Sequence, residues 1–425
     1  MKRALVNCRL LDGTKDMQLQ EGMTILLEDG YIVAIGKELP VEGYEVLDLN
    51  GKYVMPGLIN LHVHLPASGK PAKKKTDPTK LVKFILKNNL TRKLGLKICR
   101  DSAQTALLSG VTTIRTVGGI DDFDTTLKHD IENGKYFGPR IKASNYAIGP
   151  KGGHMVGSVA VPVEDRISAV EMVDKIADQG VDWIKLMITG GVLDAKVKGE
   201  PGVLKMQPGI VKACCDEAHR LGYRVCAHVE SSEGVRVALE NGVDSIEHGA
   251  VLDQHMIDLF KETGACYVCT ISPALPLAKF DQAITKVDDM AVFNSDYVMQ
   301  GIISGAKSAL ENGVKVGLGT DTGCPFITHY NLWRELEYFH KYLGVSRSFA
   351  LYTATLRNAE ILKMDDEIGS IEVGKRDDIL VVENNPLDNF TALAKPNIVI
   401  KDEHVFKEPK IKKFAEVDRL LDEYM

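Results

Sequence analysis

Apolar and polar residues alternate along about the first 50 positions of the chain, a pattern typical of half-buried β-strands. Within residues 24–36, Asp29-Gly30 separates two apolar runs, and this dipeptide predicts a tight hairpin turn. The same alternation returns at residues 369–382 and again at 398–401. The pattern therefore predicts that the two ends of the chain pair in one small antiparallel β unit.

Between the two ends, short apolar segments alternate with amphipathic segments of helical length, as in βα units around a parallel sheet. The eight expected strands are centred on residues 59–61, 111–117, 141–143, 183–188, 224–228, 245–247, 265–270 and 314–319. Eight strands over roughly 300 residues favour a closed barrel over an open sheet, although periodicity alone does not exclude the open sheet.

The whole pattern predicts an α/β fold in three parts. They are a TIM-like catalytic (β/α)8 barrel over residues 57–365, a small β-sandwich formed by residues 1–56 and 366–405, and a C-terminal helical tail over residues 406–425. Two segments interrupt the barrel rhythm: the lysine-rich residues 69–87 and the long connection 273–289. Each is either a solvated loop or a lid over the substrate.

Composition narrows the class of protein. With 44% hydrophobic and 26% charged residues among 425, the chain is typical of globular proteins, which excludes intrinsic disorder and collagen-like repeats. The net charge of -6, spread along the chain, predicts no nucleic-acid partner. Without a membrane-length apolar run or a signal-peptide pattern, we expect a cytoplasmic protein with eight reduced cysteines and no membrane partner. The sequence is compatible with a homo-oligomer but does not specify one.

Two histidines follow the first expected barrel strand. His62 and His64 are two residues apart, so strand alternation directs both imidazoles to the same side, where one metal ion can bind both. Four further residues occupy the corresponding ends of later strands: Lys185, His228, His248 and Asp321. Because the ends of barrel strands converge at one rim, these six residues predict a site for Zn²⁺ or a similar divalent ion.

Lys185 is unlike the other five residues. A protonated amine inside an apolar strand is costly and cannot bind a metal ion. Lys185 therefore needs a partner or a chemical modification.

These segments resemble those of the amidohydrolase superfamily of metal-dependent hydrolases. The resemblance covers nearly the whole chain and includes PGLINLHVH at 56–64, GVTT at 110–113, GTD at 319–321 and GSIEVGK at 369–375. The branch it is most similar to contains the Xaa-Pro dipeptidases and imidazolonepropionase-related enzymes. In the subgroup with a carbamylated fourth-strand lysine, that lysine and a hydroxide bridge two metal ions, and Lys185 matches the position.

The resemblance implies a role for each residue. His62, His64 and Asp321 would bind the more buried ion, His228 and His248 the outer ion, and modified Lys185 both. GGH at 152–154 resembles a loop of this branch, and His329 with Asn331 resembles its His-x-Asn segment, which implies substrate contacts for His154 and His329. As a loop histidine beside two glycines, His154 could instead be an ordinary solvent-exposed residue.

One position departs from the branch. Several of its dipeptidases carry a tyrosine two residues after the fifth-strand histidine, where this chain has Glu230. Glu230 either contacts a cationic group of the substrate, or it caps the next helix or forms a salt bridge near its start. Proline specificity is therefore not implied.

The resulting hypothesis is a binuclear metal-dependent hydrolase that cleaves the amide or peptide bond of a small molecule, such as a dipeptide or N-acyl amino acid. A metal-bound hydroxide would attack the carbonyl, and Asp321 would carry the proton to the leaving nitrogen. The alternative is a mononuclear aminohydrolase acting on a cyclic amidine or imidazolone. Such enzymes usually carry a glutamate three residues after the fifth-strand histidine, and this chain has Ser231 there. A non-enzymatic relative is disfavoured because all six candidate ligands are present.

Overall fold

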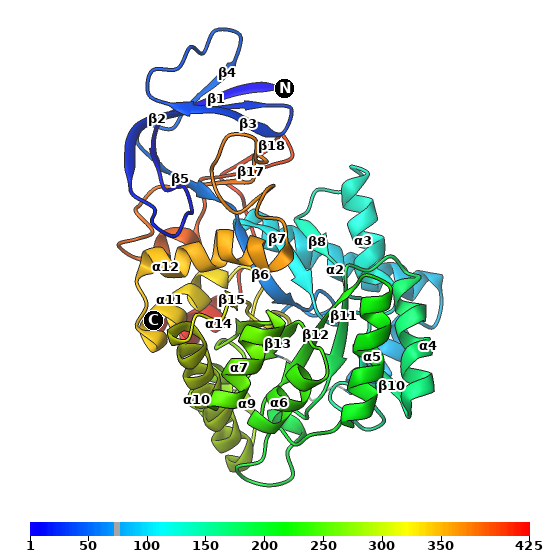
Figure 1. The fold of residues 1–425 in the computed structure, drawn as a ribbon. Coiled ribbons are helices and arrows are strands. Elements are labelled where there is room, and N and C mark those ends of the chain that lie inside the picture. Colours follow the sequence, from blue (N-terminus) through cyan, green and yellow to red (C-terminus); the bar gives the residue numbers. More distant parts are fainter. Residues whose placement is uncertain (72–76) are drawn as a thin grey trace. The chain divides into compact units, whose positions relative to one another are not determined.

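The computed structural model describes residues 1–71 and 77–425, which form two compact units (Figure 1). Unit 1 comprises Met1–Asn60, Gln104–Thr113 and Tyr330–Lys413. Unit 2 comprises Leu61–Ala103, Ile114–His329 and Phe414–Met425. The predicted three-part division at residues 56, 365 and 405 stays a prediction.

Unit 1 contains an eight-stranded sheet built from both ends of the chain. Its strands are β1 (Lys2–Leu10), β2 (Gln20–Glu28), β3 (Tyr31–Gly36), β4 (Glu45–Asp48), β5 (Tyr53–Pro56), β16 (Ile379–Val382), β17 (Ile398–Lys401) and β18 (His404–Lys407). Their order is β18-β17-β16-β5-β1-β2-β3, with β4 beside β1. The predicted pairing of the two ends is confirmed, because β5 runs antiparallel to β16 with Pro56 opposite Ile379.

The predicted hairpin is also confirmed. Glu28 of β2 lies opposite Tyr31 of β3, so Asp29 and Gly30 form a two-residue loop. Their φ angles of 48° and 83° are both left-handed, as a type I′ turn requires. The apolar residues of alternate strand positions, including Leu5, Ile25 and Ile379, form the buried core of this unit.

The helices of unit 1 follow the last strand of unit 2 in sequence. They are α11 (Leu332–Leu343), α12 (Arg347–Tyr352) and α13 (Asn358–Leu362), with a π-helical turn (Thr353–Arg357) between the last two and a 3₁₀ turn (Phe390–Ala394) before β17. Within the unit, the Asn358 side chain donates a 2.7 Å hydrogen bond to the backbone oxygen of Ile59, just before the first candidate metal ligands.

All eight strands expected between the two ends are present. They are β6 (Leu58–Val63), β7 (Val111–Thr116), β8 (Arg140–Lys142), β11 (Trp183–Met187), β12 (Arg224–Val229), β13 (Ser245–His248), β14 (Cys266–Cys269) and β15 (Val316–Leu318). Two further strands, β9 (Ala147–Pro150) and β10 (Ala160–Val163), were not expected from the pattern. The sequence between them is rich in glycine, which hides their apolar alternation.

These strands form two sheets. One has the order β6-β7-β8, and the other has the order β10-β9-β11-β12-β13-β14-β15, in which neighbouring strands run parallel. Backbone hydrogen bonds connect the two sheets at both ends: Asp182 N–H to Ala143 O at 2.7 Å, and His64 N–H to Thr322 O at 2.8 Å.

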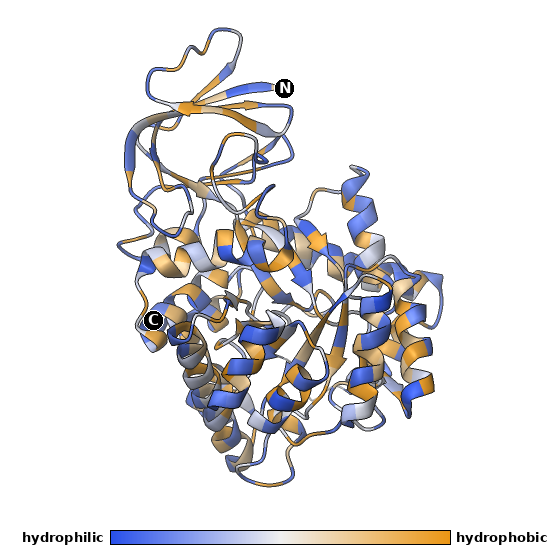
Figure 2. Ribbon diagram, viewed as in Figure 1, coloured by the Kyte–Doolittle hydropathy of each residue, from blue (hydrophilic) through white to orange (hydrophobic). Residues whose placement is uncertain are grey.

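Amphipathic helices alternate with the strands of unit 2. They are α1 (Pro78–Ile85), α2 (Asn89–Leu108, which ends in unit 1), α3 (Phe123–Glu132), α4 (Arg166–Ala177), α5 (Pro208–Arg220), α6 (Ser232–Glu240), α7 (Gln254–Thr263), α8 (Ala274–Lys279), α9 (Gln282–Thr285), α10 (Asp289–Glu311) and α14 (Ala415–Asp422). α4 contacts β11, α5 and α6 contact β12, and α10 contacts β14 and β15. Figure 2 shows both apolar and polar residues along α4 and α5, as expected for helices with one buried side.

The interrupting segments contain short helices. In residues 69–87 the structure describes α1, which begins after the capping side chain of Asp77. Lys73, Lys74 and Lys75 lie outside the described residues. The connection 273–289 contains α8 and α9.

The expected tail helix is shorter than its sequence pattern. Residues 404–407 belong to β18, and α14 begins only at Ala415, after Pro409 and a run of lysines. Val417, Leu420 and Leu421 supply its buried side. Among residues 1–71 and 77–425, we find no helix with the length and apolar character needed to cross a bilayer.

Candidate metal centre

Four histidines of unit 2 converge from the ends of three strands. His62 lies in β6, His64 follows that strand, His228 lies in β12 and His248 ends β13. The ring of His62 lies 5.3 Å from that of His64 and 4.7 Å from that of His248, which lies 4.7 Å from that of His228. The sequence placed these residues at equivalent strand ends, and the parallel sheet brings them together.

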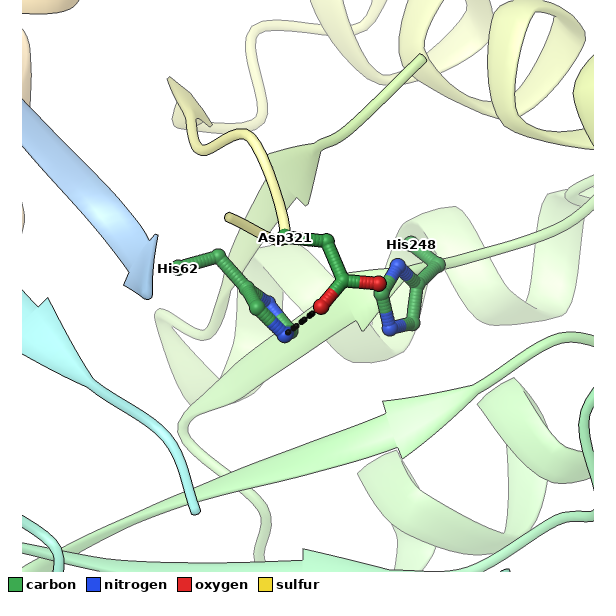
Figure 3. Close-up of side chains that lie close together, drawn as sticks. All are labelled: His62, His248 and Asp321. Carbon is green, nitrogen blue, oxygen red and sulfur yellow. Dashed lines mark ion pairs between the residues drawn. The ribbon is translucent and has the colours of Figure 1, made fainter. Parts of the chain in front are cut away.

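Asp321 follows β15 and completes the cluster. Its Oδ1 lies 3.4 Å from Nε2 of His62 and 3.1 Å from Nε2 of His64. Figure 3 shows the carboxylate of Asp321 between the rings of His62 and His248. One potential ligand atom from each of these three residues lies within 4.8 Å of the other two, which is close enough to hold one ion.

The second ring nitrogen of each histidine is held by a neighbour. Nδ1 of His64 donates to Gly118 O at 2.8 Å, and Nε2 of His228 donates to Gly190 O at 3.3 Å, because a carbonyl can only accept. Nδ1 of His62 lies 2.9 Å from Oε2 of Glu247, and Nδ1 of His248 lies 2.7 Å from Oγ1 of Thr270. These contacts fix the ring orientations.

Backbone geometry at the strand ends is unusual. His248 and Asp321 have φ angles of 67° and 56°, which non-glycine residues rarely adopt, so both are held by the surrounding structure. A side chain at Gly319 would place its Cβ 2.5 Å from Cβ of His62. Glycine at position 319 therefore lets β15 approach β6 closely enough for Asp321 to reach the histidines.

Burial sets the protonation of the cluster. Burial lowers the pKa of His62 to about 4, and it lowers the pKa values of His228 and His248 well below the usual range. Neutral imidazole is the form that binds metal ions. Burial alone would raise the pKa of Asp321, but His62 and His64 hold it well below its usual range.

Lys185 lies in β11 and is 1% exposed. Its Nζ has no hydrogen-bond partner among the described residues, and burial lowers its pKa. A buried amine without a hydrogen-bond partner is costly, so the structure sharpens the expectation that Lys185 binds something or is modified.

A buried ion pair lies behind His62, and sequence reasoning missed it. Nη2 of Arg115 donates to Oε1 of Glu247 at 2.6 Å, while Nε donates to Leu61 O at 2.8 Å. Oγ of Ser245 also donates to Oε1 of Glu247 at 2.6 Å. Burial would raise the pKa of Glu247, but Arg115 and His62 hold it well below its usual range, so the carboxylate accepts from His62.

His154 borders the cluster from the loop after β9. Its ring stacks on that of His228 with the centroids 4.2 Å apart, and its Nδ1 lies 2.5 Å from Oδ2 of Asp194. The same carboxylate oxygen accepts the backbone N–H of Gly191 at 3.0 Å. Asp194 thus orients His154, and no motif in the sequence signalled this partner.

Glu230 and His329 lie in different surroundings. Oε2 of Glu230 is buried without a hydrogen-bond partner among the described residues. Burial and the nearby carboxylates of Asp321 and Asp194 raise the pKa of Glu230 to about 8. His329 is buried, and its Nε2 donates a hydrogen bond to Ala67 O at 2.7 Å. This nitrogen is therefore occupied by a backbone carbonyl.

The donor set fits divalent ions: four imidazoles, one carboxylate and a buried amine without a hydrogen bond. His248 groups with His62 and Asp321, whose ligand atoms lie within 4.8 Å of one another, whereas the resemblance implied that His248 binds the outer ion. The division of ligands between ions and the substrate contacts of His154, Glu230 and His329 stay predictions.

Two crystal structures are similar to this chain over nearly its whole length. A candidate prolidase from Bifidobacterium longum has a crystal structure 38% identical in sequence, with a TM-score of 0.88 over 100% of this chain and 99% of that chain. An Xaa-Pro dipeptidase crystallised with methionine in its active site is 29% identical, with a TM-score of 0.80 over 96% of this chain and 100% of that chain.

A curated relative extends the comparison. Ochratoxinase from Aspergillus niger is 25% identical over 332 residues, or 72% of this chain. The match spans 66% of the ochratoxinase, just under two thirds of its length. The model of the amidohydrolase family matches residues 53–402, which include every candidate ligand. The chain therefore belongs to the amidohydrolase family.

Proposed function

We propose that this chain is a binuclear metal-dependent hydrolase that cleaves the amide or peptide bond of a small substrate, such as a dipeptide or an N-acyl amino acid. The observation that carries the proposal is the gathering of His62, His248 and Asp321, with ligand atoms within 4.8 Å of one another. The likeness to a dipeptidase and a candidate prolidase supports the peptide bond as the target.

Lys185 is the residue that favours a second ion. Reaction of its neutral Nζ with CO₂ would form an N–C bond and release one proton, and the resulting carbamate would present oxygen atoms to both ions. Nε2 of His228 is bonded to Gly190 O, so its Nδ1 is the nitrogen that can bind a metal ion. Imidazole and oxygen donors suit Zn²⁺.

Divalent ions bound by these residues would lower the pKa of a bound water and polarise the scissile carbonyl. Asp321 accepts the proton of the attacking water and passes it to the leaving nitrogen, since its depressed pKa keeps it ionised. The bonds to Glu247, Gly118 and Thr270 keep the histidine rings fixed while the substrate binds. His154 contacts the substrate carboxylate from the rim.

We further propose that β6, β7, β8 and β11–β15 close into a (β/α)8 barrel. The hydrogen bonds from Asp182 to Ala143 and from His64 to Thr322 support closure, because they connect the two sheets at both ends. Residues 1–56 and 366–405 would then form the β-sandwich.

A substrate screen tests the proposal. Dipeptides and N-acyl amino acids are incubated at neutral pH with Zn²⁺, Co²⁺ or Mn²⁺, and released amino acids are quantified, with chelated protein as the control. We expect hydrolysis that requires metal and weakens when the substrate carboxylate is esterified. Release of ammonia from purines, pyrimidines or imidazolones, without amide hydrolysis, would instead identify a mononuclear aminohydrolase.

A further inference from the structure

We propose that Glu230 binds the free α-ammonium group of the substrate and thereby makes this enzyme prefer dipeptides over N-acyl amino acids. This inference rests on the proposed function and identifies the residue that sets its specificity. Glu230 follows β12 and is two residues after His228, so alternation along an extended chain directs both side chains toward the same side.

The carboxylate of Glu230 lies within electrostatic range of other acidic side chains of unit 2. The charges of Asp321 and Asp194 act on it, and its own charge acts on Cys324, which follows Asp321 by three residues. The backbone N–H of Val192 donates to the carboxylate. Glu230 is therefore anchored at the rim between two loops that border the candidate metal centre.

The other two carboxylates at this rim already have partners. Asp321 contacts His62 and His64, and Asp194 contacts His154 and the backbone of Gly191. Glu230 differs because its Oε2 is buried without a hydrogen bond, and it forms no ion pair with the described residues. A buried carboxylate oxygen without a donor is destabilising unless a ligand supplies one.

A ligand ammonium group would supply the missing hydrogen-bond donor, because it carries three N–H groups and no acceptor. In a dipeptide the α-nitrogen is separated from the scissile carbonyl carbon by one atom. An anchor two residues after the candidate ligand His228 is therefore suited to the α-ammonium, whereas a lysine side chain would carry its ammonium several bonds further away. N-acyl amino acids lack the cation and leave Glu230 unpaired.

Matched substrates test the inference. We compare an alanyl dipeptide with the propionyl compound that replaces its ammonium by hydrogen, using the metal-loaded enzyme. We expect wild type to favour the dipeptide about 10- to 100-fold in kcat/KM, the range of a charge-assisted hydrogen bond. Glu230→Gln should remove this preference by raising KM for the dipeptide, while kcat/KM for the propionyl compound stays within about threefold.

Glu233→Gln is the control, since this carboxylate is exposed in the first turn of α6. Equal losses for both substrates in Glu230→Gln, or no change for either, would overturn the inference. The first result would indicate a structural or proton-transfer role.

A binding measurement separates this inference from the proposed function. Calorimetry with a ketomethylene dipeptide analogue and its des-amino counterpart needs no turnover. If the enzyme hydrolyses no amide, wild type should still bind the amino compound more tightly, and Glu230→Gln should bind both equally. Equal binding of both compounds by wild type would refute the role of Glu230 whether or not amides are hydrolysed.

Discussion

Replacing Arg115 with methionine perturbs the buried ion pair behind His62. Methionine keeps most of the side-chain length but removes the guanidinium, so Glu247 loses its 2.6 Å hydrogen bond from Nη2. Both side chains are fully buried, so water cannot replace the lost donor. Breaking a buried ion pair from one side costs about 3–5 kcal/mol, and we expect the free energy of unfolding of unit 2 to fall by that amount.

Trp183 provides the assay. The guanidinium carbon of Arg115 lies 4.7 Å from its ring centroid, and the chain contains only one other tryptophan, Trp333. In a Trp333→Phe background, urea titration followed by tryptophan fluorescence therefore reports the unfolding of unit 2. Adding Glu247→Gln completes a double-mutant cycle, and direct contact predicts a coupling of at least about 1 kcal/mol.

Arg236→Met is the matched control, because it removes an exposed 3.4 Å ion pair with Glu240. Its cost should be at most about 0.5 kcal/mol. The reasoning is refuted if Arg115→Met costs no more than this control, or if Arg115→Met and Glu247→Gln are additive.

Three further changes have distinct expected outcomes. Gly319→Ala should lower metal affinity at least tenfold in equilibrium dialysis, because its Cβ would lie 2.5 Å from that of His62, whereas Gly301→Ala, with 3.6 Å to its nearest neighbour, should not. Asp321→Asn should lower kcat at least about a hundredfold while KM changes little, and a near-normal kcat in a fully metallated variant would place proton transfer elsewhere. Burial raises the pKa of Asp377 from 3.8 to about 6, so the folded state binds more protons between these values and stability falls as pH rises through them. In urea titrations, Asp377→Asn should therefore stabilise the protein by up to about 3 kcal/mol at pH 7 but not at pH 3.5. Equal effects at both pH values would contradict the raised pKa of Asp377.

The sequence predicted the strands well because their apolar runs are short and bounded by glycine or polar residues. It also predicted that His62 and His64 share one side, since alternation along a strand is a local property. The pattern did not predict β9 and β10, because the glycines between these strands interrupt it. The helix of the tail begins later than its pattern predicts, because Pro409 and the following lysines delay its start.

The partners of the candidate ligands could not be predicted in the same way. Arg115 and Glu247 are 132 residues apart, and their pairing depends on how β7 and β13, which belong to different sheets, place them in one interior. Asp194 lies in a loop whose path no periodic pattern specifies, yet it contacts His154. Contacts of this kind follow from tertiary packing, which a single sequence does not display.

The most direct test of the account is the number of divalent ions bound per chain, measured by elemental mass spectrometry of purified wild type and Lys185→Ala. Wild type should bind two ions per chain, because the proposed carbamate of Lys185 joins two sets of ligands. Lys185→Ala should bind fewer ions and regain part of its metal content and activity when short carboxylic acids are added. One ion per wild-type chain, together with an unmodified Lys185 in a crystal structure, would contradict the binuclear centre.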